Sequence, residues 1–166
     1  MIDIRGGDLQ DSRILALLGL HLARCRAESP PESTHAHDVS GLQGKGIGFW
    51  AAWAGENLLA VGALAELAPD HGEVKSMHTA EAARRRGVAR LMLGHIEAEA
   101  RARGYQRLSL ETGSMDYFAP ARAMYRRHGF RDCAPFGNYV EDPNSVFMTL
   151  TLQVSESGES AVTPPV

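Results

Sequence analysis

Apolar and polar residues alternate in several short segments of the chain, and this two-residue period is typical of β-strands. Ile2 and Ile4 alternate with charged residues before a glycine pair ends the first segment. Within 73–79 the alternation places Val74, Ser76 and His78 on one side of a strand and Glu73, Lys75, Met77 and Thr79 on the other. The full set of predicted strands is 2–5, 49–53, 58–67, 73–79, 108–112 and 146–154.

Apolar residues at a spacing of three or four predict three helices. The first follows Asp8 as N-cap, with Asp11 three residues on, and buries Cys25 as a small packed residue. The second runs from about 87 to 103, and a glycine stops it. The third covers 119–128 and also ends at a glycine. We expect the second helix to direct Leu91, Leu93, Ile96 and Ala100 to the core.

The connections between these elements set the topology. A short turn joins 49–53 to 58–67, which predicts an antiparallel hairpin, whereas a helix joins 73–79 to 108–112, which predicts a parallel pair. The sequence therefore predicts a mixed α/β fold, with one mostly antiparallel twisted sheet flanked by helices and one strand-helix-strand crossover. We expect one domain over 1–154 and a disordered tail over 155–166, which is rich in Ser, Glu and Pro.

The segment 27–48 is longer than a simple connector and contains one turn of helix, predicted near 38–42. Long loops in compact domains often carry function. We therefore expect this loop to form a wall of the substrate site.

Composition narrows the classes of partner. The chain has 166 residues, a net charge of −3 and two cysteines, Cys25 and Cys133, that lie far apart with no metal-ligand spacing. An acidic balance argues against nucleic-acid and membrane-surface binding, and no apolar run approaches the roughly 18 residues of a membrane span. We expect a cytoplasmic protein with reduced thiols and no bound metal.

One corner of the chain has the chemistry of an anion site. Three arginines, Arg84, Arg85 and Arg86, precede Gly87 at the point where a predicted strand gives way to a predicted helix. A helix N-terminus offers unpaired N–H groups and partial positive charge, so an anion is stabilised there. This corner is a candidate phosphate site.

Two motifs in order resemble those of the GCN5-related N-acetyltransferase (GNAT) superfamily. The segment Arg84-Arg-Arg-Gly87-Val-Ala89 matches the acetyl-CoA motif Arg/Gln-x-x-Gly-x-Gly/Ala. Downstream, 121–130 is similar to the signature Ala-x-x-Leu/Met-Tyr-x-x-x-Gly-Phe. The resemblance spans about 2–154 and implies the GNAT fold with acetyl-CoA as cosubstrate. Segments 113–118 and 142–148 look like a bacterial subgroup of uncharacterised acetyltransferases.

The resemblance also implies how the cosubstrate is held. Backbone N–H groups from Arg85 to Ala89 would cradle the pyrophosphate, and the strand edge at 77–79 would pair with the pantetheine arm, with an N–H near Met77 facing the thioester carbonyl. Many relatives have asparagine where this chain has Phe118, so that contact would be apolar. The implied cofactor-binding residues are Met77, His78, Thr79, Arg84, Arg85, Arg86, Gly87, Val88, Ala89, Arg90, Phe118 and Ala121.

Proton transfer has several candidates. Tyr125 lies where the superfamily places the tyrosine that hydrogen-bonds the CoA sulfur, although its position on an apolar helix face also fits a core residue. Glu73 aligns with an acidic residue found early on this strand in many relatives, so it could take the amine proton directly or through water. It fits equally well as a surface carboxylate paired with Lys75. His78 is a competing base, expected on the face opposite Glu73.

The predicted function is acetyl-CoA-dependent N-acetylation of a primary amine on a small molecule or an exposed protein amine. Direct attack in a ternary complex is expected, because neither cysteine adjoins a predicted base. His35 and His37 are a third option for the base, or line the acceptor pocket. The alternative is a non-catalytic acyl-CoA sensor or partner module. The sequence leaves the oligomeric state open, and homodimers are common in the superfamily.

Overall fold

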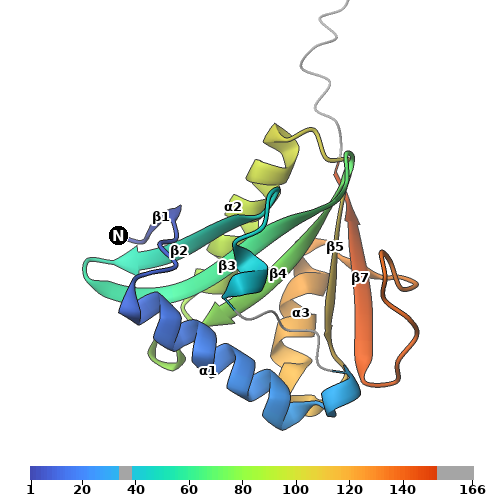
Figure 1. Cartoon of the computed structure of the whole chain (residues 1–166), viewed down its shortest axis with the longest axis horizontal. Coiled ribbons are helices and arrows are strands. Elements are labelled where there is room, and N and C mark those ends of the chain that lie inside the picture. Colours follow the sequence, from blue (N-terminus) through green and yellow to red (C-terminus); the bar gives the residue numbers. More distant parts are fainter. Residues whose placement is uncertain (34–38, 153–166) are drawn as a thin grey trace, which may run out of the picture.

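The structure is a computed structural model that describes residues 1–33 and 39–152 (Figure 1). Its seven strands form one sheet in the order β1-β2-β3-β4-β5-β7-β6. Among the described residues β4 and β5 form the only parallel pair, and the other pairs are antiparallel. The predicted fold class is confirmed. The strands are β1 (Asp3–Gly6), β2 (Gly48–Ala54), β3 (Asn57–Ala68), β4 (His71–Thr79), β5 (Arg107–Gly113), β6 (Arg131–Asp132) and β7 (Ser145–Thr151).

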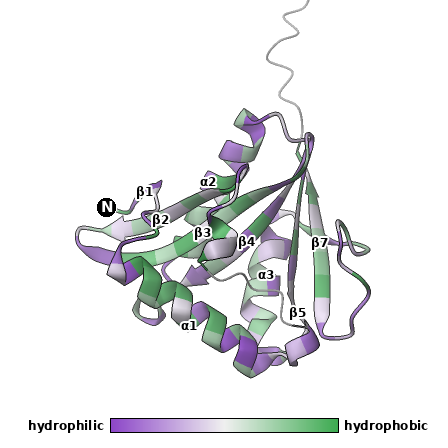
Figure 2. Ribbon diagram, in the orientation of Figure 1, coloured by the Kyte–Doolittle hydropathy of each residue, from purple (hydrophilic) through white to green (hydrophobic). Residues whose placement is uncertain are grey.

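Three helices cover the two faces of the sheet: α1 (Ser12–Glu28), α2 (Val88–Ala102) and α3 (Ala119–His128). In Figure 1, α1 crosses in front of the sheet and α2 lies behind it. Figure 2 shows α1 with green and purple stretches in alternation, as expected for a helix with one buried side. The α1 face is built on Ile14, Leu17, Leu18, Phe49, Trp53, Val61 and Ala63, and the opposite face on Leu64, Val74, Val88, Met92, Leu93, Ile96, Leu108, Leu110, Tyr125 and Phe130.

Two details of the helices differ from the sequence prediction. Asp11, not Asp8, caps α1, because the Asp8 carboxylate already accepts a hydrogen bond from the Gln10 N–H in a preceding turn. In α2, Leu91 is 50% exposed, and Met92 takes its place in the core. The buried side of α2 consists mainly of residues spaced four apart, which face the sheet together: Val88, Met92, Ile96 and Ala100.

The predicted turn of helix near 38–42 is confirmed as a short 3₁₀ turn, Ser40–Leu42, which buries Leu42. A second 3₁₀ turn, Pro31–Ser33, follows the end of α1.

β4 and β5 pair only at their beginnings. Their register runs from His71 opposite Arg107 to Glu73 opposite Ser109, and both strands then continue for several residues without pairing to each other. In Figure 1 the two strands meet at the top of the sheet and separate below. The sheet is therefore split along this line, and residues of both strands beyond the split border the gap.

A bulge changes the direction of side chains along β4. Lys75 pairs with Ala63 and His78 with Val61, so Ser76 and Met77 together lie opposite Gly62. Ser76 has a φ of 55°, in the left-handed region. Cross-strand partners share a face, so His78 lies on the same face as Glu73 and Lys75. The prediction that His78 opposes Glu73 is wrong, because the bulge adds a residue to the alternation.

Candidate active site

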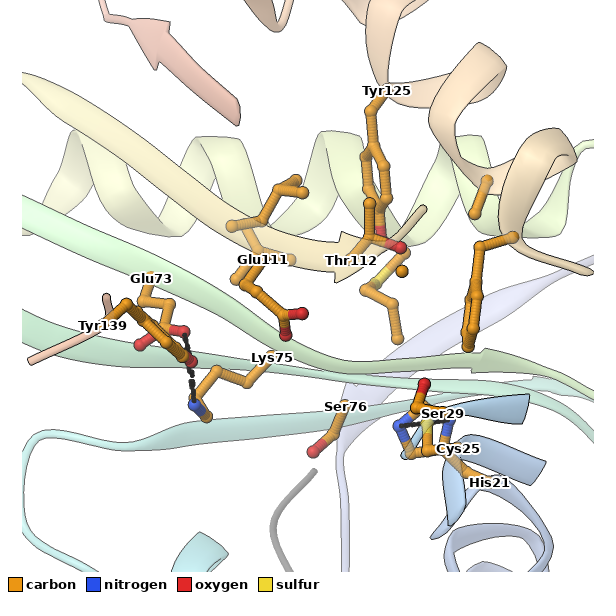
Figure 3. A pocket seen from close by; sticks show the side chains of 16 residues that line it. His21, Cys25, Ser29, Glu73, Lys75, Ser76, Glu111, Thr112, Tyr125 and Tyr139 are labelled. Carbon is orange, nitrogen blue, oxygen red and sulfur yellow. Dashed lines mark hydrogen bonds and ion pairs between the residues drawn. The ribbon is translucent and has the colours of Figure 1, made fainter. Parts of the chain in front are cut away.

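A pocket occupies the gap between β4 and β5, and residues from both faces of the sheet line it (Figure 3). The helix α1 contributes from one side, and α3 contributes from the other. Because the sheet is split here, a ligand in the gap is reached from both faces. The lining residues are His21, Cys25, Ser29, Glu73, Val74, Lys75, Ser76, Met77, Leu110, Glu111, Thr112, Gly113, Phe118, Ala121, Tyr125 and Tyr139.

The arginine-glycine corner follows the open end of β4, after a 3₁₀ turn over Glu81–Ala83. Residues 84–87 are exposed, and Arg85 and Gly87 have φ values of 63° and 76°. The first main-chain hydrogen bond of α2 runs from the Leu91 N–H to the Gly87 carbonyl, so the earlier N–H groups of the helix remain available. In the described part of the chain, the arginines at 84, 85, 86 and 90 form no ion pair. The corner fits an anionic ligand.

The other predicted cofactor residues divide into two groups. Met77, Phe118 and Ala121 line the pocket, and the Phe118 ring packs against Gly113 on β5. His78 and Thr79 do not line it. They are the last two residues of β4. Beyond the split, the β4 edge that faces β5 has no strand partner among the described residues.

Tyr125 combines the two roles that the sequence left open. It is 6% exposed and belongs to the core cluster, with its ring edge-on to Phe130 at 5.8 Å between centroids. It also lines the pocket, and its hydroxyl has no hydrogen-bond partner in the described residues. Burial raises the pKa of this phenol, so it stays protonated at neutral pH. The hydroxyl is a donor available to a ligand.

Glu73 is buried in a polar network rather than placed on the surface. It is 5% exposed, and its Oε2 accepts hydrogen bonds from the Tyr139 hydroxyl at 2.6 Å and the Lys75 ammonium at 3.2 Å. Lys75 also donates to the Tyr139 oxygen at 3.3 Å. The predicted pairing with Lys75 is confirmed, but the surface position is wrong, because loop residue Tyr139 covers the pair.

Glu111 is a site residue that sequence reasoning missed. It lies on β5 beyond the split, on the same face as Glu73, since Ser109 two residues earlier pairs with Glu73. Burial raises the pKa of its carboxyl to about 7. The Ser145 hydroxyl and the Lys75 ammonium oppose this rise, and the Glu73 carboxylate adds to it. The available signal was a carboxylate inside a predicted strand, directly after Leu110.

His21, Cys25 and His78 meet where α1 crosses β4. The Nδ1 atoms of the two histidines are 3.2 Å apart, and the Cys25 Sγ lies 3.8 Å from the His21 Nε2. The prediction that Cys25 is only a packed residue with no adjoining base is wrong, because one turn of α1 places His21 beside it in the pocket. Burial lowers the pKa of both histidines to about 4 and raises that of Cys25 to about 11, so all three are neutral at pH 7.

Two further expectations concern metals and membranes. His35 and His37 lie outside the described residues. Within residues 1–33 and 39–152 no group of three or more His, Cys, Asp or Glu side chains could hold a metal ion. None of the helices in the same ranges is long and apolar enough to cross a membrane.

Comparison with known proteins defines the class. Residues 16–130 match the model of the Acetyltransferase (GNAT) family. The chain is 51% identical over 149 residues to YsnE of Bacillus subtilis, named as an uncharacterised N-acetyltransferase, covering 90% of this chain and 99% of that protein. The chain therefore belongs to the GNAT family and is an N-acetyltransferase by class.

Solved structures agree on the fold. A crystal structure from Klebsiella pneumoniae, named as an acyl-CoA N-acyltransferase, superposes with a TM-score of 0.76 at 25% identity, covering 92% of this chain and 99% of that one. A Bacillus subtilis acetyltransferase crystallised in complex with CoA superposes with a TM-score of 0.70 at 19% identity, covering 92% of this chain and all of that one, 100%.

Proposed function

We propose that the protein transfers the acetyl group of acetyl-CoA to a primary amine by direct attack within a ternary complex. Family membership and the crystallisation of a structural relative with CoA support the choice of donor. The residues of this chain fit that molecule: exposed arginines and free N–H groups suit a pyrophosphate, and the unpaired edge of β4 suits an extended amide chain. When bound, acetyl-CoA supplies an activated acetyl group as a thioester.

The observation that carries the proposal is a proton donor and a proton acceptor reaching one cleft from opposite faces of the sheet. Figure 3 shows Tyr125 entering from α3, whereas the Glu111 carboxylate lies nearer Lys75 and Ser76 on β4. The pKa of the Glu111 carboxyl is about 7, so its carboxylate form is well matched to accept the proton of an amine near neutral pH. The Tyr125 hydroxyl donates a hydrogen bond to the sulfur as it gains charge.

The protonation state of Cys25, the one thiol that lines the pocket, supports direct transfer. Cys25 lies beside His21, but burial holds the thiol protonated and the imidazole neutral, and a thiol is a weak nucleophile. Transfer through an acetylated cysteine is therefore disfavoured. In a direct transfer, Glu111 would accept the proton that the amine loses as it is acetylated, and the Tyr125 hydroxyl would hydrogen-bond the departing thiolate.

Glu111 is preferred to Glu73 and His78 as the base. The Glu73 carboxylate is already engaged by Lys75 and Tyr139. His78 does not line the pocket, and burial lowers the pKa of its imidazole to about 4, too low to hold an amine proton near neutral pH.

Release of CoA should be measured with a panel of free amino acids, polyamines and peptides. We expect turnover by the wild type, and a loss of about 100-fold or more in kcat/KM for Glu111→Gln, with disappearance of an activity rise centred near pH 7. Tyr125→Phe should lower kcat by about 10-fold to 100-fold with little change in acetyl-CoA binding. Glu66→Gln, an exposed carboxylate outside the pocket, is the matched control.

The result that would contradict the proposal is acetyl-CoA binding by the wild type without turnover of any amine. The non-catalytic acyl-CoA sensor would then be the better description.

A further inference from the structure

We propose that Glu73 is a positioning residue, which together with Lys75 holds Tyr139 and so fixes the loop 133–144 as a rigid wall of the acceptor pocket. The inference rests on the proposed function, because that function places the acceptor amine on this face of the sheet. It assigns Glu73 and Glu111 different roles, although both carboxylates lie on the same face.

The three groups form a closed network. The Tyr139 hydroxyl donates to Glu73 Oε2 at 2.6 Å, which is short, as expected for a hydrogen bond to a carboxylate. The Lys75 ammonium lies 3.2 Å from the same oxygen and 3.3 Å from the Tyr139 oxygen. The Lys75 and Glu73 side chains are 11% and 7% exposed, so water competes little for these bonds.

Tyr139 connects this network to the loop. The loop leaves β6 at Cys133, whose N–H bonds the Phe147 carbonyl, and rejoins the sheet at β7. In between, the Tyr139 ring packs against Phe136 and Phe147, with centroid distances of 5.1 and 5.5 Å, and its hydroxyl reaches across the pocket to β4. The Phe136 ring also lies 5.9 Å from the His71 ring at the start of β4, so cutting the hydroxyl contact removes the tie to Glu73 and Lys75 and leaves that ring contact in place.

The same contacts make Glu73 unsuited to receive the amine proton. Its Oε2 already accepts bonds from an ammonium and a phenol, so an arriving proton would displace one of them or leave it unpaired. Glu111 has the Ser145 hydroxyl as a neighbour, but no ammonium and phenol hold its carboxylate as they hold that of Glu73. A carboxylate that is fully engaged before the acceptor binds is better suited to shaping the pocket.

Steady-state kinetics separate positioning from catalysis. Tyr139→Phe keeps the ring and removes the bond to Glu73, so we expect the KM for the amine to rise about tenfold, with kcat and the KM for acetyl-CoA changing less than threefold. Glu73→Gln keeps an oxygen that accepts from Tyr139, so it should raise the amine KM less than Glu73→Ala does. The activity rise should persist in both Glu73 variants but move to lower pH, because the Glu73 carboxylate helps to raise the pKa of Glu111.

A fall of 100-fold or more in kcat for Glu73→Gln, with loss of that rise, would overturn the proposal and make Glu73 the base. The matched control is Tyr105→Phe, which removes a buried hydroxyl that donates to Glu66 outside the pocket. It should leave the amine KM unchanged.

Hydrogen exchange tests the loop without any turnover. We expect amides within 134–142 to exchange about tenfold faster in Tyr139→Phe than in wild type or Tyr105→Phe, with amides of α3 unchanged. Equal exchange in all three proteins would overturn the positioning role even if amines are acetylated. Faster exchange in a protein that acetylates no amine would sustain the loop contact while the proposed function fails, so the two failures are distinguishable.

Discussion

At the scale of single residues, neighbours decide what each carboxylate of the cleft can do. Glu73 lies against an ammonium and a phenol, whereas Glu111 is buried with an opposing cation that only partly offsets the loss of water. The two carboxylates therefore have different contacts, and we assign one as the base and the other as a positioning group.

The raised pKa of Glu111 has a consequence for stability. Its carboxyl has a pKa near 4.5 when unfolded and about 7 when folded, so the folded protein holds this proton more tightly. The resulting stabilisation is fully present below about pH 4.5 and is lost as pH rises through 7. We therefore expect Glu111→Gln to increase the free energy of unfolding at pH 8 by on the order of 1–3 kcal/mol, and much less at pH 5. Urea titrations at the two pH values measure this; an equal change at both would contradict it.

The thiols offer a second test at this scale. The double variant Cys25→Ala, Cys133→Ala should retain turnover within about threefold of wild type, because both thiols have raised pKa values and neither is required to carry the acetyl group. CoA release is measured beside acetyl-CoA binding. Complete loss of turnover with binding intact would show that transfer passes through a cysteine.

At the scale of elements, the corner before α2 depends on one glycine. Gly87 has a φ of 76°, and no atom would obstruct a Cβ there, so the cost of Gly87→Ala is conformational. We expect a loss of about 1 kcal/mol in stability and weaker acetyl-CoA binding, because the N–H groups at the helix start shift.

Gly94 provides the control for that substitution. It lies inside α2 with open space beyond its Cα, so Gly94→Ala should raise stability by about 0.5–1 kcal/mol without affecting binding. Urea unfolding and calorimetric titration with acetyl-CoA compare the pair. The interpretation fails if both variants bind acetyl-CoA equally well.

At the scale of the whole molecule, the domain boundary proposed from the sequence can be tested by truncation. Leu152 is 3% exposed, and its N–H bonds the Gln106 carbonyl. A chain ending at 154 should therefore keep its free energy of unfolding within about 0.5 kcal/mol. One ending at 151 should lose about 2–3 kcal/mol with that buried leucine. Urea titration of both chains checks this, and equal stability of the two would contradict the boundary.

The sequence predicted structure best where the pattern lies in residues that are neighbours in the chain. Strand and helix periods, and the short motifs around Arg84 and Tyr125, depend on consecutive residues, and they were enough for the fold class and the cofactor corner. Prediction was weakest at β4, where the bulge at Ser76 reverses the alternation and moves His78 to the face of Glu73. A bulge depends on how one strand matches its partner, which no local period records.

The sequence by itself therefore determined the order of elements and the family, and it pointed to Tyr125 as a candidate proton donor, because each of these depends on residues close together in the chain. Only the tertiary structure decided which side chains share the cleft. His21, Glu111 and Tyr139 come from separate elements, and they meet because β4 and β5 separate after Glu73 and a loop folds back over the gap. Those contacts depend on strand register and on packing between distant segments, so Glu111 could be proposed as the base only once the fold had brought its neighbours together.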